Sequence, residues 1–353
     1  MKKRLIFLMI ATPIIWLVVV APLTTLFSWW TPSLDTFKAL AWSVLLAPVV
    51  SFSIFASFQT SNLLLKWPLT QLIGWTTVLM NVVALCWVLL FFLPGVTVAL
   101  ISTIAWLLIG AYAVRKAHDI KNTGLEIHSD KINKPCKLMH LSDVHAGSRR
   151  SAFIEKVVDQ AIQKQPDIVV ITGDLLDSSA VDSKYLQPLS KFSCPVYLCL
   201  GNHERYVDLQ NAIDAIKANN VRVLRDESVV TADLEIIGID DAENPAQVES
   251  VLPTIKRNTS LFQILLYHKP QGFEFAAANH TDLMLSGHTH AGQVWPFRVL
   301  VKRQFPLIKG VYQQNGSTLY VSQGTGTWGP IMRLGTECEM TLITLTPGSL
   351  AVQ

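Results

Sequence analysis

Charged side chains are scarce in this chain. Asp, Glu, Lys and Arg together make up 16% of its 353 residues, whereas hydrophobic side chains make up 50% and the mean hydropathy is +0.35. Such a composition is too apolar for an ordinary soluble globular protein. Because the apolar excess lies before residue 115, the sequence predicts a membrane region followed by a soluble domain.

Ionisable residues are missing inside the apolar stretches of this first part. Residues 5–30, 39–58 and 69–114 contain no Asp, Glu, Lys, Arg or His. Transporters and proton pumps usually carry such groups at mid-membrane, where they bind ions or relay protons. Their absence disfavours a transport function.

Four membrane-spanning helices are predicted within residues 1–115. A helix of about 20 apolar residues crosses a hydrocarbon core about 30 Å thick, so residues 69–114 can form two spans around the break at Pro94 and Gly95. We expect spans at about 5–30, 38–58, 69–93 and 96–114. A cleaved signal peptide is the alternative for the first, but its apolar core is usually shorter than this one.

Basic residues concentrate on one side of the predicted spans. That side carries Lys2, Lys3, Arg4, Lys66, Arg115 and Lys116. The other side has Lys38 close to Asp35. The positive-inside rule then predicts a multi-pass protein of the cytoplasmic (inner) membrane, with both termini and the soluble domain in the cytoplasm.

Cysteine is also sparse, and no dense basic stripe occurs outside the membrane flanks. None of the five cysteines forms a pair with the two-residue spacing of zinc or redox sites. The net charge is only +3. Nucleic acid polymers are therefore not expected as partners.

The soluble part alternates apolar strands with helical stretches. Residues 116–135 are expected to form a linker with a first strand, and residues 136–353 one domain. Strands are predicted at 137–141, 168–172, 196–200, 235–239, 263–267, 283–286, 318–322 and 340–345, and helices at 151–163, 209–218 and 248–256. This order predicts an α/β fold with a two-layered β core flanked by helices.

Five short polar runs stand at the ends of predicted strands, where open α/β sheets hold their ligands. They are Asp143-Val-His145, Gly173-Asp174-Leu-Leu-Asp177, Gly201-Asn202-His203-Glu204, a lone His268, and Gly287-His288-Thr-His290. An Asp-x-His or Gly-Asp pair alone is more often a turn or a cap, whereas Gly-Asn-His-Glu is more specific. The ordered set of five is not explained by turns.

The residue types in these runs indicate a two-metal site. Carboxylates mixed with imidazoles suit manganese, iron or zinc better than magnesium or calcium. On an extended strand end Asp143 and His145 would point the same way and hold one ion, and His288 and His290 repeat that spacing. Asp174, just after a glycine, is expected to be the carboxylate that bridges the two ions. Two such ions bind a phosphate and place a shared hydroxide in line with the leaving group.

The five runs, in this order, resemble the signature of the calcineurin-like metallophosphoesterase family. The resemblance covers about residues 136–347. The longer strings 287–293 and 332–335 further resemble the membrane-anchored bacterial branch of that family. Ala146 departs from the bulkier residue of many relatives, but it is not a ligand. The resemblance implies a metallophosphoesterase-type β-sandwich after the four-helix transmembrane region.

The resemblance also implies individual roles. One ion would be held by Asp143, His145, Asp174 and His290. The other would be held by Asp174, Asn202, His268 and His288. His203 would be the general acid for the leaving oxygen, oriented by Asp177.

Three arginines are expected as substrate ligands, because a guanidinium can bind phosphate oxygens bidentately. Arg149 and Arg150 follow the first ligand run, where a solvated helix start is the alternative. Arg333 lies in the second family-like string. His140, inside an apolar strand, is expected to be a packed core residue. Glu204 is expected to support its loop rather than bind metal.

Two functions are compatible with these residues. The first is a membrane-anchored, metal-dependent hydrolase of phosphodiesters, pyrophosphates or phosphomonoesters, acting through a metal-bridging hydroxide. Its substrate could be lipid-linked, with membrane lipids as partners, because four spans exceed what anchoring needs. The second is a non-catalytic membrane scaffold or sensor that binds metal or nucleotide. The complete ligand set favours the hydrolase.

Overall fold

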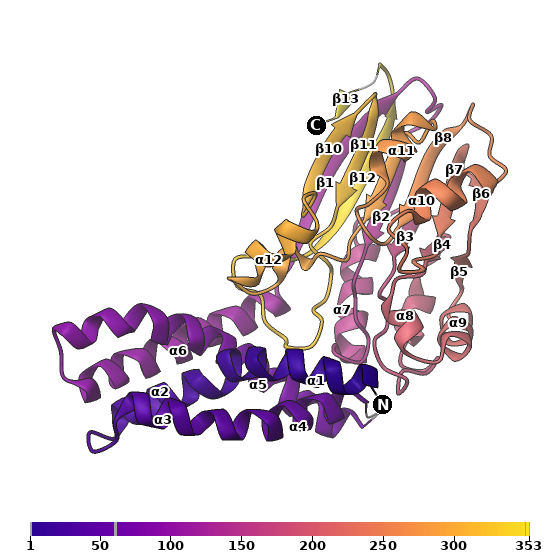
Figure 1. The fold of residues 1–353 in the computed structure, drawn as a ribbon. Helices are drawn as coiled ribbons and strands as arrows, with labels where there is room; N and C mark the ends of the chain where they lie inside the picture. The colour runs from indigo at the N-terminus through magenta and orange to yellow at the C-terminus, as the bar shows by residue number, and fades with distance from the viewer. Residues whose placement is uncertain (1, 60–61, 350, 353) are drawn as a thin grey trace. The chain divides into compact units, whose positions relative to one another are not determined.

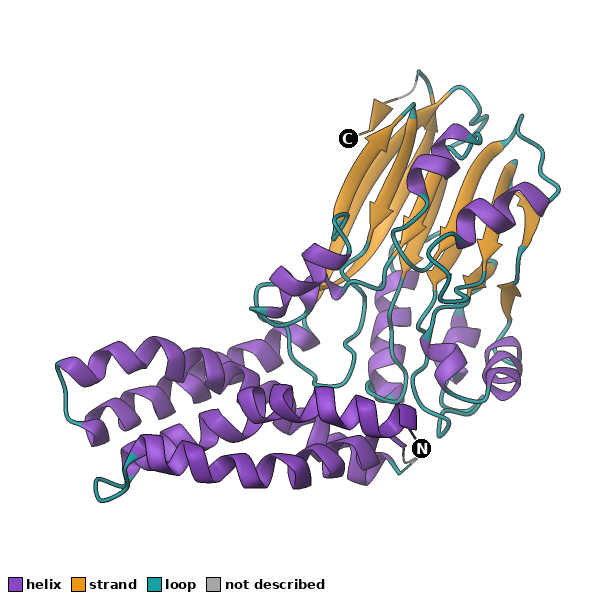
Figure 2. Ribbon diagram, in the orientation of Figure 1, coloured by secondary structure: helices purple, strands orange, loops and turns teal. Residues whose placement is uncertain are grey.

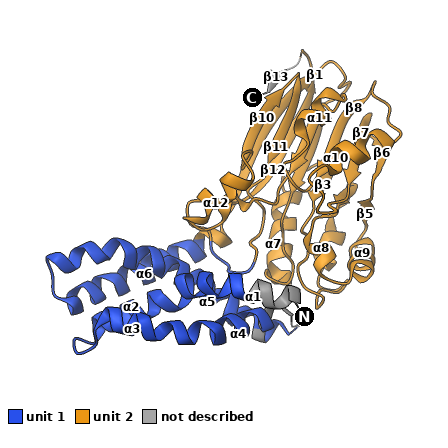
Figure 3. Ribbon diagram, viewed as in Figure 1, with its two compact units in different colours: residues 1–115, 329–332 blue, residues 116–328, 333–353 orange. Residues whose placement is uncertain are grey.

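The computed structural model describes residues 2–59, 62–349 and 351–352. The chain divides into two compact units, residues 1–115 with 329–332 and residues 116–328 with 333–353 (Figure 3). The domain limits expected at residues 1 and 353 lie outside the described residues. Figure 1 labels the elements in chain order.

The first unit is built from helices that are long and apolar enough to cross a membrane. The candidate spans are Met9–Trp30, Thr36–Ala56, Lys66–Phe91 and Gly95–His118. They comprise α1 (Lys2–Ile15), α2 (Ala21–Trp30), α3 (Thr36–Ser43), α4 (Ala47–Gln59), α5 (Leu63–Cys86) and α6 (Gly95–His118). The prediction of four such helices is confirmed.

Polar caps decide where two of these helices begin. The side chain of Asp35 accepts the backbone N–H of Lys38 at 2.8 Å, and that of Asn62 accepts the N–H of Leu64 at 3.0 Å. Such caps satisfy N–H groups that have no partner in the first turn of a helix. The apolar pattern does not contain this signal, so α5 begins six residues before the predicted span.

The second unit contains two mixed β-sheets, which Figure 2 shows in orange. The seven-stranded sheet has the order β13-β1-β12-β2-β3-β4-β5. Its strands are β13 (Ala351–Val352), β1 (Ile120–Ser129), β12 (Cys338–Pro347), β2 (Cys136–Leu141), β3 (Ile168–Thr172), β4 (Val196–Cys199) and β5 (Val221–Leu224). Strands β2 to β5 run parallel, and β12 is antiparallel to β2.

The six-stranded sheet has the order β10-β11-β9-β8-β7-β6. Its strands are β10 (Gly310–Gln314), β11 (Ser317–Val321), β9 (Leu283–Ser286), β8 (Phe262–Tyr267), β7 (Leu234–Ile239) and β6 (Glu227–Thr231). The four inner strands run parallel, and each edge strand is the antiparallel arm of a hairpin. This sheet is therefore mixed, with a parallel centre and antiparallel edges.

Alternating side chains of the inner strands divide the core into layers. On β3, Ile168 and Val170 belong to the cluster between the sheets, whereas Val169 and Ile171 pack with the helices outside. Successive residues of a strand point to opposite faces, so a strand covered on both faces must be apolar throughout. The fold is therefore a β-sandwich flanked by helices, as the sequence predicted.

Helices cover the outer faces of both sheets. Buried residues of α7 (Ser151–Ile162) and α9 (Leu209–Lys217) share a cluster with β2 and β3, while α10 (Gln247–Val251) and α11 (Phe273–Ala278) pack on the other sheet. Two further helices, α8 (His203–Tyr206) and α12 (Phe297–Gln304), lie in loops that follow site residues. The expected linker region consists of the end of α6, β1 and the turn after β1.

Candidate metal centre

The predicted ligands follow the carboxyl ends of five parallel strands, three in one sheet and two in the other. They come after β2, β3, β4, β8 and β9, and Figure 1 labels the first four of these strands. Ligand sites of open α/β sheets lie at this edge, because loops there converge from neighbouring strands. The sandwich thus gathers distant residues at one place.

The first group of ligand atoms comes from Asp143, His145 and His290. The Nε2 atoms of the two histidines lie 3.1 Å apart, and Asp143 Oδ1 lies 3.4 Å from His290 Nε2. All three side chains are buried, and their ligand atoms lie within 4.8 Å of one another. This group could hold one metal ion.

The second group comes from Asp174, His268 and His288, joined by Asn202. His268 Nε2 lies 3.1 Å from Asp174 Oδ2, from Asn202 Oδ1 and from His288 Nδ1. Asp174 Oδ2 also lies 3.8 Å from His145 Nε2, which belongs to the first group. Asp174 is thus the carboxylate placed between the two groups.

The donor chemistry of both groups fits divalent ions. Pairs of imidazole nitrogens lie so close together that two protonated rings would repel each other. Neutral imidazoles mixed with carboxylates are a ligand set that suits transition metals. Second contacts hold several rings: His268 Nδ1 lies 2.8 Å from the carbonyl oxygen of Thr172, an arrangement typical of metal-binding histidines. The structure therefore supports metal binding at this site.

The local geometry expected for the ligand runs was wrong. Asp143 and His145 were expected on an extended strand end, but their φ angles are 52° and 54°. Asp174, His288 and His290 also have positive φ, at 51°, 69° and 46°. Non-glycine residues rarely adopt this region, and such strain concentrates at functional sites. The side chains converge because the chain turns sharply after each strand.

Two glycines permit the close approach of ligand loops. A Cβ atom on Gly287 would lie 2.0 Å from Ser142 Oγ and 2.1 Å from Asp143 Oδ2, and one on Gly201 would lie 2.2 Å from Asp174 Oδ1. Any side chain at either position would collide with a ligand. The glycines of these two motifs are thus required by packing.

Burial and neighbouring charges shift the pKa values of the buried carboxylates and imidazoles in opposite directions. Burial would lower the pKa of His268, but the carboxylates of Asp174 and Asp143 outweigh it and raise the pKa to about 10. Burial raises the pKa of Asp143. Burial would also raise the pKa of Asp174, yet His268 and His203 hold it well below its usual range. The centre thus concentrates negative charge that a cation can balance.

His203 lies beside the shared carboxylate and is mostly buried. Its Nε2 is 3.9 Å from Asp174 Oδ2, and its side chain is 15% exposed. The ring stands edge-on to His145 at 4.8 Å and to Trp328 at 5.7 Å. Burial lowers the pKa of His203 to about 4, although Asp174 and Asp177 act in the opposite direction.

Asp177, expected to orient His203, lies next to a metal-ligand candidate. Its Oδ2 is 3.5 Å from Nδ1 of His145, and it accepts hydrogen bonds from Ser148 N at 3.0 Å and Ser148 Oγ at 2.5 Å. A carboxylate behind a ligating imidazole fixes its orientation and raises its basicity. These contacts support His145 directly.

Glu204 connects the loops that carry Asp174 and Asn202. Its carboxylate accepts the backbone N–H groups of Asp174, Leu176 and Gly201 at 3.1, 3.2 and 2.8 Å. The side chain is fully buried, which raises its pKa to about 7. Glu204 supports its loop, as expected.

The three predicted arginines differ in their surroundings. Arg149 is buried, lies 3.6 Å over the ring of Phe153 and donates to the carbonyl of Ala117 at 3.0 Å. Arg333 is buried behind His290, with its guanidinium 2.9 Å from the His290 carbonyl and 3.1 Å from Nδ1. Arg150 is exposed at the start of α7.

An ion pair that the motifs do not contain also supports the site. Lys269 follows His268, and its Nζ lies 3.0 and 2.9 Å from the two carboxylate oxygens of Asp241. The backbone N–H of Asp241 donates to the carbonyl of Leu200, just before the Gly201 loop. Asp241 lies two residues after the end of β7, so its position behind an apolar strand was the signal in the sequence that could have indicated it.

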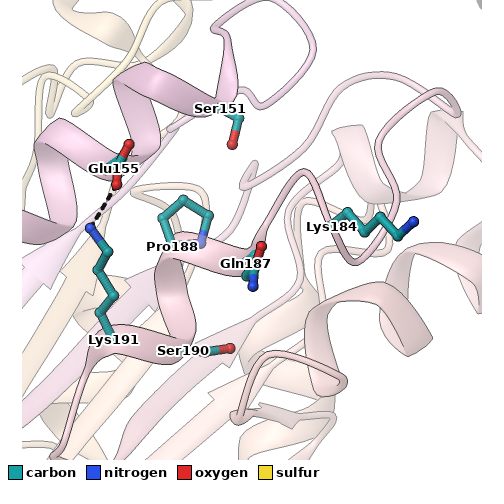
Figure 4. A pocket seen from close by; sticks show the side chains of 7 residues that line it. All are labelled: Ser151, Glu155, Lys184, Gln187, Pro188, Ser190 and Lys191. Atoms are coloured by element: carbon teal, nitrogen blue, oxygen red, sulfur yellow. Dashed lines mark hydrogen bonds and ion pairs between the residues drawn. The ribbon is translucent and has the colours of Figure 1, made fainter.

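Another hollow of the second unit involves different residues. It has a volume of about 470 Å³ and is lined by Ser151, Glu155, Lys184, Gln187, Pro188, Ser190 and Lys191 (Figure 4). Lys191 pairs with Glu155 across it at 2.8 Å. None of these residues is a predicted ligand or catalytic group.

Comparison with known proteins identifies the class of the second unit. The profile of the family described as Calcineurin-like phosphoesterase matches residues 136–292. An uncharacterized metallophosphoesterase of Aquifex aeolicus is 33% identical over 252 residues, which cover 67% of this chain and 96% of the relative. The chain belongs to the calcineurin-like metallophosphoesterase family, and the resemblance seen in the sequence is confirmed.

Other relatives are longer than the matched region. An uncharacterized metallophosphoesterase of Campylobacter jejuni is 33% identical over 65% of this chain and 64% of its own length. A transmembrane protein with metallophosphoesterase domain from Danio rerio is 32% identical over 66% of this chain and 59% of its own. The chain thus spans less than two thirds of these relatives. The four candidate spans and the transmembrane relative from Danio rerio together indicate a membrane protein.

Proposed function

We propose that this chain is a membrane-anchored hydrolase of phosphate esters or pyrophosphates that uses two divalent metal ions. The observation that carries the proposal is the position of Asp174, whose Oδ2 atom lies 3.1 Å from His268 Nε2 of one group and 3.8 Å from His145 Nε2 of the other. Two ions bridged by one carboxylate are typical of phosphate-transfer sites. Family membership supports hydrolysis as the reaction class.

The proposed ligand sets follow the two groups. Asp143, His145, Asp174 and His290 would hold one ion. Asp174, Asn202, His268 and His288 would hold the other. Manganese, iron and zinc all suit these donors. When bound, the ions would polarise the phosphoryl oxygens and lower the pKa of water so that it can attack phosphorus.

His203 is proposed to protonate the leaving oxygen. Its Nε2 lies 3.9 Å from Asp174 Oδ2, and its side chain is 15% exposed, so it can face a substrate. The negative charge of a bound phosphate, added to those of Asp174 and Asp177, would raise its pKa from the low value set by burial. Asp177 contributes this charge and also supports His145, 3.5 Å away.

A different function is proposed for each of the three arginines. Arg150 is the exposed candidate for binding phosphate oxygens of the substrate. Arg333 is proposed to act through His290, a proposed metal ligand, because its guanidinium bonds to that residue. Arg149 is proposed to contribute by fixing the loop that carries His145, whose carbonyl accepts the Arg149 N–H at 2.8 Å.

We propose that the second unit faces the cytoplasm at the inner membrane and acts on phosphate-containing substrates that can be lipid-linked. Basic residues flank the spans on the side of both termini, which supports this orientation. Helix α6 ends at His118 and β1 begins at Ile120. The linker between the candidate span α6 and the first strand is therefore a single residue, and we propose that the domain works at the bilayer surface.

Hydrolysis of two chromogenic esters tests the proposal. Full-length protein with added manganese should release nitrophenolate from bis-nitrophenyl phosphate or nitrophenyl phosphate, and Asp174→Ala should abolish this release. The ratio of the two rates assigns diester or monoester preference. Metal binding without release from these esters or from lipid phosphates would favour a non-catalytic scaffold or sensor instead.

A further inference from the structure

The segment between His290 and Phe305 carries an unusual exposed surface. In helix α12, Val299 and Leu300 are 67% and 65% exposed, and Trp295, just before it, is 50% exposed. Large apolar side chains are costly to leave in water, and clusters of them mark binding surfaces. We call Trp295, Val299, Leu300, Lys302 and Arg303 the α12 surface.

Positive charge accompanies these apolar side chains. Lys302 and Arg303 are exposed, and Arg298 is half-buried. In the part of the chain that the structure describes, none of the three forms an ion pair. From Asp282 to Glu337 the sequence contains no other acidic residue but five basic ones. The surface is therefore apolar and cationic together.

The α12 surface is connected to the metal centre at both ends. The 3-10 turn His290–Gly292 packs against α12, where the Cα of Arg298 comes close to Gly292. At the other end the Phe305 ring stands edge-on to His288 at 4.9 Å. A ligand on α12 would therefore lie near the groups proposed to bind metal.

We propose that the α12 surface docks on the anionic lipid surface of the membrane in which the chain is anchored. A short helix with Val and Leu beside Lys and Arg, preceded by Trp295, matches the composition of interfacial segments, which place apolar side chains among the acyl chains and basic ones at the headgroups. Only Asp119 lies between α6 and β1, so the domain stays close to a bilayer. Charge complementarity selects anionic lipid over a neutral surface.

Docking would present the metal centre to phosphates at the headgroup level. This part of the inference rests on the proposed membrane location and substrate, whereas the docking itself requires no hydrolysis. A protein partner on the same surface is the competing occupant. The two differ in one measurable property, which is contact between α12 and lipid.

Site-specific fluorescence quenching in nanodiscs tests the docking. The full chain, with the partly exposed Cys86 and Cys194 replaced by Ala, would carry Leu300→Cys labelled with bimane. Val230→Cys is the matched control, because Val230 is 59% exposed on β6, at the opposite edge of the sheet from β10. The probe is phosphatidylcholine bearing a nitroxide on its acyl chain, with or without phosphatidylglycerol.

The label at residue 300 should be quenched at least about twofold more than the label at residue 230, and more strongly with phosphatidylglycerol present. Lys302→Glu with Arg303→Glu should remove the increase. Equal quenching of the two labels in both lipids would overturn the proposal and favour a protein partner. Adding Asp174→Asn should leave the quenching unchanged, so a failure of docking and a failure of hydrolysis can be distinguished.

Discussion

The Oε2 atom of Glu204 accepts hydrogen bonds from the backbone N–H groups of both Asp174 and Gly201. These N–H groups belong to two loops that supply ligands after different strands. A single buried carboxylate therefore sets the distance between the bridging residue and the Asn202 loop. The metal centre depends on this residue although it need not touch an ion.

Glu204→Gln should weaken metal binding without removing a ligand. The amide N–H₂ of Gln donates, so one of the two positions that now accept backbone N–H groups would face a donor. Loss of such a supporting contact typically lowers metal affinity by about 10–100-fold. Manganese titration of purified full-length protein measures this. Glu155→Gln, at an exposed carboxylate, is the control, and equal affinities of the two variants would contradict the role of Glu204.

Gly287→Ala should destroy the metal centre. The added Cβ would lie 2.1 Å from Asp143 Oδ2, so the loop or the ligand would have to move. Displacement of Asp143 would remove one oxygen donor from the first group, and metal content measured after gel filtration should fall. Gly124→Ala is the control, since a Cβ there meets nothing within 4 Å. Retained metal and activity in Gly287→Ala would refute the close packing described for this loop.

His203→Asn should slow hydrolysis according to the leaving group. General acid catalysis typically contributes about 10²–10⁴-fold, and this contribution matters most when the leaving oxygen is strongly basic. Alkyl phosphates should therefore lose far more rate than nitrophenyl phosphates, while metal content stays unchanged. Rates for a series of leaving groups provide the measurement. A uniform loss across the series would argue against proton donation by His203.

Arg333→Lys should lower metal affinity or turnover through His290. The guanidinium bonds to the His290 carbonyl, to Nδ1 and to the carbonyls of Gly324 and Gly326, and a lysine cannot reproduce this fork. A loss of about 10–100-fold in metal affinity is expected from other supporting contacts of this kind. Arg149→Lys, equally buried but bonded to Ala117, should leave metal affinity much closer to that of the unchanged chain. Substrate binding by Arg333 itself would instead raise KM at unchanged metal affinity.

The sequence predicted the elements whose signal is local. The inner strands and the four apolar helices were found because each is a continuous apolar run of sufficient length. The strand β10, which pairs with β11 in a hairpin, was missed, although Asn315 and Gly316, both with positive φ, form a turn that favours hairpins. The strand β1 was expected only loosely, because six of its ten residues are polar and it pairs with β12, which lies more than 200 residues away in the sequence.

The supporting contacts of the site could not be predicted from spacing. The pair of Asp241 and Lys269 and the position of Asp177 beside His145 arise from the packing of two sheets, which brings together residues with no pattern in common. The positive φ angles of the ligands likewise follow from turns that no motif specifies. Residue types indicated the chemistry, whereas tertiary structure determined the supports.

His140 should make stability depend on pH below neutrality. Burial lowers its pKa to about 3, while an unfolded histidine titrates near about 6.5. Between these two pKa values the unfolded state binds a proton that the folded state does not. The contribution of His140 to stability is therefore complete above about pH 6.5 and falls by up to about 1.4 kcal/mol per pH unit below it.

His140→Gln can keep a hydrogen bond to Thr172, whose Oγ1 lies 2.8 Å from Nε2 of His140. Between about pH 7.5 and pH 5.5 the Tm of His140→Gln in detergent should fall less than that of the unchanged chain, by about 2–4 °C for each kcal/mol avoided. His280→Gln, at an exposed histidine, should follow the unchanged chain, and parallel Tm curves for all three proteins would show that His140 does not titrate on unfolding.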